Sequence, residues 1–158
     1  MPDGHSRISV HVEYNGWNKI SSVEKFVSTL IYDTCRYMGV YASPEDKREI
    51  SALLSTDARI QDLNHQFRGK NTPTNVLSFP AQDKDYIGDI IVAYETMQRE
   101  AAAQKKPLSD HLAHLTVHGT LHLLGFDHEA EEEAQMMEDT EIRILATHGI
   151  ANPYKESL

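Results

Sequence analysis

The spacing of three histidines constrains this chain more than any other feature of the sequence. His118 and His122 are four residues apart, so in a helix their side chains lie one above the other on one face. Gly125 follows as a residue that can end the helix in a left-handed conformation, and His128 comes three residues later. The pattern predicts a helix and a turn that bring three imidazole rings to one metal ion.

Three neutral nitrogen donors with a fourth position left open are typical of catalytic zinc sites. A zinc ion in such a site lowers the pKa of its bound water to about 7. His111 and His114 lie on earlier turns of the same helix face, and we interpret them as packed or supporting residues rather than ligands. The alternative is that these histidines only pack in the core or face solvent. That alternative does not explain why the helix face, the ligand spacing and Gly125 occur together.

The same spacing occurs in the H-E-x-x-H-x-x-G-x-x-H pattern of metzincin peptidases, with one difference. Gly119 stands where those enzymes have the glutamate that acts as general base, and glycine has no side chain to accept a proton. A zinc peptidase therefore remains an alternative only if another carboxylate takes that role. Asp127 is close in sequence, but it can equally orient a histidine.

Strand and helix patterns interleave in the first half of the chain, and helices dominate the second half. Period-two alternation or short apolar runs predict strands at residues 7–14, 49–55, 76–79 (closed by Pro80) and 86–94. Helical spacing and end signals predict helices at residues 22–39, 57–68, 95–106, 109–124 and 129–148. We expect one α+β domain over residues 1–158, with a small mixed sheet of about four strands packed by helices and the metal-binding helix and turn near the C-terminal third.

The formal net charge of −9 argues at first against a nucleic-acid partner. Residues 127–141, however, hold eight acidic residues and no Lys or Arg. The rest of the chain holds 16 acidic and 15 basic residues, so its charges nearly balance. The acidity is therefore local. We interpret the segment as a solvated helix face, or alternatively as a docking face for a basic ribosomal protein, with four apolar residues turned to the core: Met136, Met137, Ile142 and Leu145.

Neither a membrane segment nor a disulfide is expected from this sequence. No run of about 20 apolar residues occurs, and the first ten residues include Asp3, His5 and Arg7 where a signal peptide would be apolar. Cys35 is the single cysteine, which favours a reducing compartment. We expect a cytoplasmic protein without a membrane partner.

A second candidate motif lies in residues 64–80, where a polar loop with glycine and proline joins a helix end to a strand. Arg68 and Lys70 are at that helix end. Either they only complement the helix dipole, or they bind phosphate, for which the planar guanidinium of Arg68 is well suited.

Together these stretches resemble a known family. Residues 64–80, the Gly88-Asp89-Ile90 strand and above all residues 118–128 are similar to the YbeY family, the bacterial rRNA maturation factor, and Gly119 is that family's own residue. The resemblance implies a zinc-dependent, single-strand-specific endoribonuclease that acts in ribosomal RNA maturation, at the 3′ end of the small-subunit RNA, and in ribosome quality control.

Residue by residue, the resemblance implies that His118, His122 and His128 hold one Zn²⁺ ion and that Arg68 is catalytic. We add Lys70 as a substrate-binding residue. The expected partners are single-stranded and ribosomal RNA, with small-subunit ribosomal proteins as further candidates. A non-catalytic ribosome-assembly factor with a structural zinc ion remains the main alternative.

Overall fold

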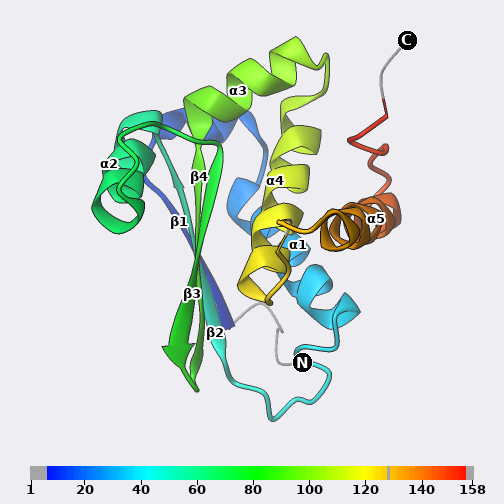
Figure 1. Ribbon diagram of the computed structural model, residues 1–158. Helices are drawn as coiled ribbons and strands as arrows, with labels where there is room; N and C mark the ends of the chain where they lie inside the picture. The colour runs from blue at the N-terminus through cyan, green and yellow to red at the C-terminus, as the bar shows by residue number, and fades with distance from the viewer. Residues whose placement is uncertain (1–6, 128, 156–158) are drawn as a thin grey trace.

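The computed structural model, which describes residues 7–127 and 129–155, contains one four-stranded sheet in the order β1-β2-β4-β3 (Figure 1). Strands β1 and β2 pair in parallel, as do β2 and β4, whereas β3 is antiparallel to β4. The sheet confirms the predicted α+β class. Its strands are β1 (Ile8–Val12), β2 (Glu49–Ser55), β3 (Val76–Asp83) and β4 (Tyr86–Ala93).

Strand β3 is longer than predicted. Pro80 was expected to close it, but the strand runs on to Asp83, with an irregular register between Pro80 and Asp83. Proline lacks the backbone N–H that a residue of an inner strand donates to a neighbouring strand. It is tolerated here because β3 pairs only with β4 and forms one edge of the sheet.

In the part of the chain that the structure describes, five α-helices follow the predicted order, with ends that shift by a few residues. They are α1 (Val23–Tyr37), α2 (Asp57–Arg68), α3 (Tyr94–Ala103), α4 (Leu108–Leu123) and α5 (Glu131–Thr147). A short 3-10 helix, η2 (Asn15–Lys19), was not predicted. It buries Trp17, whose indole N–H donates to the Ser55 carbonyl oxygen at 3.1 Å, a partner that local sequence does not indicate.

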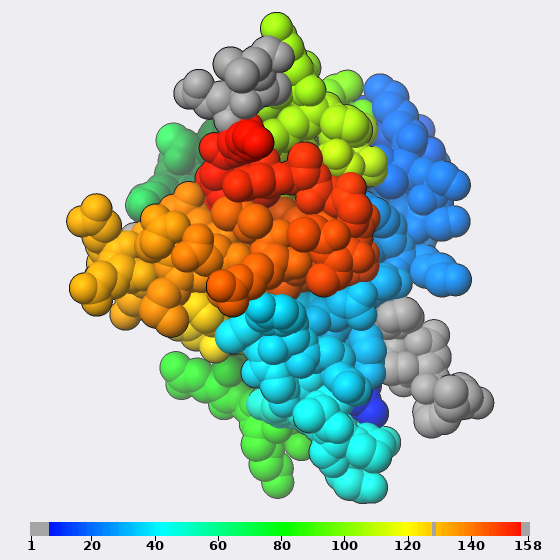
Figure 2. All heavy atoms as spheres, turned by 90° about the vertical axis from the view of Figure 1, so that its right-hand side faces the viewer, coloured from blue at the N-terminus to red at the C-terminus, as the bar shows by residue number. Residues whose placement is uncertain are grey.

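The helices divide unequally between the two faces of the sheet. Figure 1 shows α1, α4 and α5 on one side, whereas α2 lies alone on the other side. Buried side chains such as Ile50, Leu54 and Ile90 form the main core beneath the first group. Figure 2 looks onto that side and shows α5, in orange, lying across the outside of the molecule.

Two glycines let α4 approach the sheet closely. A Cβ atom on Gly119 would lie 3.0 Å from Cγ2 of Ile90 and 3.1 Å from Cγ2 of Val76. A Cβ atom on Gly88 of β4 would lie 2.7 Å from a methyl carbon of Leu123, at a backbone φ of +155°. These close contacts set the distance between α4 and strands β3 and β4, and so the position of the histidines of α4 relative to the sheet.

None of the helices in the described ranges is both long and apolar enough to cross a bilayer.

Candidate functional site

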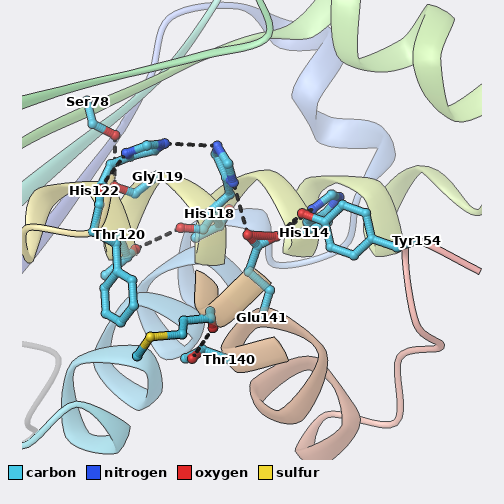
Figure 3. Close-up of polar contacts among 12 residues, drawn as sticks. Ser78, His114, His118, Gly119, Thr120, His122, Thr140, Glu141 and Tyr154 are labelled. Atoms are coloured by element: carbon cyan, nitrogen blue, oxygen red, sulfur yellow. Dashed lines mark hydrogen bonds and ion pairs between the residues drawn. The ribbon is translucent and has the colours of Figure 1, made fainter. Parts of the chain in front are cut away.

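His118 and His122 face each other across one turn of α4. Their Nε2 atoms lie 3.1 Å apart, and their ring centroids 4.6 Å apart (Figure 3). Each ring also has a partner for its other nitrogen: Nδ1 of His118 lies 3.1 Å from Oε2 of Glu141, and Nδ1 of His122 lies 2.9 Å from the carbonyl oxygen of Phe126. The predicted spacing therefore places two imidazoles at one point.

These contacts assign the protons of the two rings. A carbonyl oxygen and an ionised carboxylate only accept, so both histidines donate through Nδ1–H. In a neutral ring the Nε2 atom then carries a lone pair, and two lone pairs that face each other at 3.1 Å repel unless a cation or a proton lies between them. Two nitrogens bound to one tetrahedral zinc ion lie about 3.4 Å apart, so the pair fits a metal ion.

Glu141 orients His118 from helix α5. It belongs to the acidic segment that the sequence suggested was solvated, but its side chain is fully buried. Met137 and Leu145 of the same helix are buried as predicted, Ile142 is half-buried, and Met136 is 61% exposed, contrary to the prediction. Helix α5 is therefore rotated about its own axis relative to the predicted orientation, so that Glu141 points toward α4 and Met136 points to solvent.

Three donors surround the Glu141 carboxylate. His114 Nε2 lies 2.7 Å from Oε1, the Tyr154 hydroxyl donates to the same oxygen at 2.6 Å, and His118 contacts Oε2. Burial raises the pKa of the Glu141 carboxyl, but these hydrogen bonds outweigh burial and lower the pKa to about 2. The carboxylate is therefore ionised at neutral pH, and Figure 3 shows it between His118 and the pair His114 and Tyr154.

His114, His118 and Glu141 form a second group with the donor atoms to hold a metal ion, since one atom from each lies within 4.8 Å of the others. The two histidines, however, already contact the two oxygens of the Glu141 carboxylate, at 2.7 Å for Oε1 and 3.1 Å for Oε2. We therefore interpret this group as a hydrogen-bonded support for His118, and the Nε2 atoms of His118 and His122 as the metal-facing ones.

A cavity of about 610 Å³ opens beside the two histidines. Its lining includes residues that are far apart in sequence: Arg68, Lys70, Ser78, His118, His122 and Asp127. The structure thus brings both predicted basic residues to the same hollow as the two histidines. Asp127 and Glu129 add carboxylates to the lining, and both residues are exposed.

Arg68 is held at the edge of this cavity by α2 and β3. Thr56 caps the start of α2 by accepting a hydrogen bond from the Arg59 N–H at 3.2 Å, and Gly69 ends the helix with a φ of +68°. The Arg68 guanidinium donates to the Ser78 carbonyl oxygen at 2.7 Å and lies over the Phe79 ring, 5.3 Å from its centroid.

Ser78 links the arginine to the histidine helix. Its hydroxyl donates to the Gly119 carbonyl oxygen at 2.8 Å, while its own carbonyl accepts from Arg68. The sequence motif did not single out this serine. A buried hydroxyl next to a close-packed glycine is recognisable only once α4 is placed on β3.

His128, the third predicted ligand, lies outside the described residues. Of the other histidines on α4, His111 is buried and contacts Glu100 rather than the cavity, with 2.9 Å between Nε2 and Oε1. His114 supports Glu141. Both match the interpretation that they are packed or supporting residues.

An α+β fold whose histidines, arginine and lysine line one cavity is typical of metal-dependent enzymes that act on phosphate esters. The chain belongs to the YbeY family: the family model described as Endoribonuclease YbeY matches residues 12–149.

Curated relatives agree with this assignment. Endoribonuclease YbeY of Methylocella silvestris is 43% identical over 155 residues, which cover 96% of this chain and 87% of that protein. Endoribonuclease YbeY of Sinorhizobium fredii is 40% identical over 157 residues, covering 93% of this chain and 91% of that protein. The solution structure of TM1509 from Thermotoga maritima has the same fold, with a TM-score of 0.55, 22% identity, and coverage of 94% of this chain and 99% of that chain.

Proposed function

We propose that this protein is a zinc-dependent endoribonuclease that cleaves single-stranded RNA. The observation that carries the proposal is the single cavity in which the Nε2 atoms of His118 and His122, 3.1 Å apart, share a lining with Arg68 and Lys70. Family membership supports the reaction class, because the relatives are endoribonucleases by name.

His118 and His122 would hold the zinc ion, with His128 as the third ligand that the family resemblance implies. When bound, the ion acts as a Lewis acid and activates water. Glu141 fixes the ring of His118 and the Phe126 carbonyl fixes that of His122, so both rings are oriented before any substrate arrives.

Arg68 binds the phosphate that is cleaved or its neighbour. Its guanidinium has five N–H donors, and its contacts with Ser78 and Phe79 hold the group at the cavity without neutralising its charge. Lys70 contributes a second positive charge to the same lining. The carboxylates of Asp127 and Glu129 line the cavity as well and are candidates to accept a proton, whether water or the RNA 2′-hydroxyl is the attacking group.

The proposed substrate is ribosomal RNA at the 3′ end of the small-subunit RNA, with a role in ribosome quality control, as the family resemblance implies. Small-subunit ribosomal proteins are the corresponding partners. A cytoplasmic location fits this substrate and the buried, unpaired Cys35, whose thiol has its pKa raised to about 12 by burial.

Cleavage of a labelled single-stranded ribosomal RNA fragment by the zinc-loaded protein tests the proposal. Wild type is compared with Arg68→Ala, His122→Ala and a matched control, Arg143→Ala, which removes an exposed arginine of α5 that does not line the cavity. We expect Arg68→Ala to lower turnover about 100-fold or more, because the group that stabilises charge on the phosphate is lost.

The control variant should cleave at the wild-type rate. Equal cleavage by all four proteins would show a contaminating nuclease. RNA binding by wild type without any cleavage would instead favour the non-catalytic assembly factor.

The structure gives a physical reason against a metzincin-type general base at position 119, so the peptidase alternative depends on the cavity carboxylates Asp127 and Glu129. Position 119 points at the sheet, where even a Cβ atom would lie 3.0 Å from Ile90, and not into the cavity. A glutamate at this position would have no room, so the metzincin type of general base is incompatible with the packing of α4.

A further inference from the structure

A second hollow lies on the opposite side of strand β3 from the histidines, and no role has been assigned to it. Its volume is about 520 Å³. It is formed where α2 leaves the sheet face partly covered, and Figure 1 shows α2 on the side of the sheet away from α1, α4 and α5. We call it the α2 groove and define it by its apolar wall: Leu53, Leu63, Phe67, Phe79 and Ile91.

Phe67 makes this groove unusual. It is 61% exposed, although a large apolar side chain gains by burial, and its ring meets that of Phe79 edge to face at 5.6 Å between centroids. The two rings leave an open aromatic surface beside a floor of aliphatic side chains. Aromatic surfaces of this kind stack on nucleobases of any sequence.

The α2 groove adjoins the cavity through Arg68. Phe67 and Arg68 are consecutive, and the Arg68 guanidinium lies over the ring of Phe79, which belongs to the groove wall. A phosphate held by Arg68 therefore has an apolar hollow directly beside it. The base of an adjoining nucleotide is the part of RNA that matches this surface.

Polar groups at the groove give such a base hydrogen-bond partners. The Asp89 carboxylate lines the groove, and the Tyr86 hydroxyl donates to it. A carboxylate accepts hydrogen bonds from the exocyclic amino groups of bases. Arg59 lies at the rim, where its Nε atom pairs with Glu13 at 3.8 Å and the exposed guanidinium can still contact a second phosphate of the strand.

We propose that the α2 groove binds one unpaired nucleobase of the RNA substrate, stacked on the exposed ring of Phe67 and flanked by Phe79. This proposal rests on the proposed endoribonuclease function and deepens it: a base inside a duplex is already stacked and paired, so a site that takes up one base selects single-stranded RNA. Phe67 is then a specificity residue for that substrate.

Methyl NMR titration with nucleoside 5′-monophosphates tests the proposal without any cleavage. We expect AMP and CMP to shift the methyl signals of Leu53, Leu63 and Ile91, and ribose 5-phosphate, which has no base, to leave them in place. Phe67→Ala should weaken nucleotide binding about 10-fold, and Phe67→Tyr, which keeps the ring, should retain it. The matched control Tyr37→Ala removes an exposed aromatic residue of α1 and should have no effect.

Cleavage kinetics provide the second measurement. Phe67→Ala should raise KM for single-stranded RNA about 10-fold and leave kcat nearly unchanged, because the base contact is remote from the bond that breaks. Since Phe67 is mostly exposed, the variant should fold, and circular dichroism checks this.

Three results would overturn the proposal: equal shifts with ribose 5-phosphate, nucleotide shifts confined to the histidine cavity, or groove methyls that respond to a basic amphipathic peptide and not to nucleotides. A wild-type protein that binds nucleotides in the groove but cleaves no RNA would refute the endoribonuclease function and leave base binding supported. If Phe67→Ala cleaves normally, with unchanged KM and unchanged nucleotide affinity, base binding in the α2 groove is refuted and the endoribonuclease function stays supported.

Discussion

Two of the contacts between a histidine of helix α4 and a glutamate, those of His118 and His111, differ in what surrounds the second nitrogen of the ring. Near the C-terminal end of α4, His118 contacts Glu141 through Nδ1 and faces His122 and the cavity through Nε2. About two turns toward the N-terminus, His111 contacts Glu100 through Nε2, and its Nδ1 is buried without a hydrogen-bond partner among the described residues.

The comparison teaches that a histidine and carboxylate pair does not by itself identify a functional site. Burial lowers the pKa of His111 despite the opposing effect of Glu100, so its ring is kept neutral inside the fold. Glu100 also accepts from Asn75 and so ties α3 and α4 to the loop before β3. The His111 contact stabilises the fold, whereas the His118 contact orients a ring toward a cavity.

The largest expected difference between the two contacts concerns the metal. Zinc added to the metal-free protein at about 100 times its Kd should raise the Tm by roughly 5–10 °C, because the ion binds the folded state. His122→Ala should lose this increase and His111→Gln should keep it. Differential scanning calorimetry measures both, and an undiminished increase in His122→Ala would remove His122 from the ligand set.

Substitution of the two glutamates sharpens the comparison. Glu141→Gln should weaken zinc affinity about 10–100-fold, because the amide no longer holds the Nδ1–H of His118 as a carboxylate does. Glu100→Gln, the matched variant, should bind zinc as wild type does. Competition with a chromogenic chelator gives both affinities, and equal losses would mean that the two contacts play the same role.

The contact at His111 should matter for stability. Glu100→Leu leaves His111 Nε2 and the Asn75 amide without their acceptor, at a cost of about 1–3 kcal/mol in the free energy of unfolding. Urea unfolding measures the loss. Unchanged stability, or a loss of zinc affinity with stability intact, would contradict a structural role.

The smallest expected effect is a pH dependence of stability. Because the pKa of His111 is lowered in the folded state, the unfolded chain binds its proton more readily, and stability present above the ordinary pKa of about 6.5 is lost as the pH falls through the folded value. His111→Gln should flatten the urea midpoint between pH 7 and pH 5. His65→Gln, at an exposed histidine of α2, serves as the control and should retain the wild-type slope.

The parts of the site that follow from local periodicity were predictable. The positions of His118 and His122 on one helix face depend only on helical geometry. The start of α2 follows from Thr56, and its end, which carries Arg68, follows from Gly69. The α+β fold class was predictable as well, because the strand and helix patterns are visible in local periodicity.

Other parts depend on how distant elements dock. Glu141 lies in a run of acids that look alike in sequence, and only the rotation of α5 on α4 selects it for burial. That rotation also exposes Met136. Likewise Pro80 continues β3 because the strand is an edge, which depends on the strand order and not on the residues near the proline.

The hydrogen bond from Tyr154 to Glu141 has a consequence for the order in which the molecule is assembled. A ribosome makes the chain from its N-terminus, so this hydroxyl emerges after every strand and helix that the structure describes. Until then the buried carboxylate behind His118 lacks one of its three donors. The metal-facing ring reaches its final support only when synthesis has passed α5 and Tyr154, so the mature site forms later than the helix that carries its histidines.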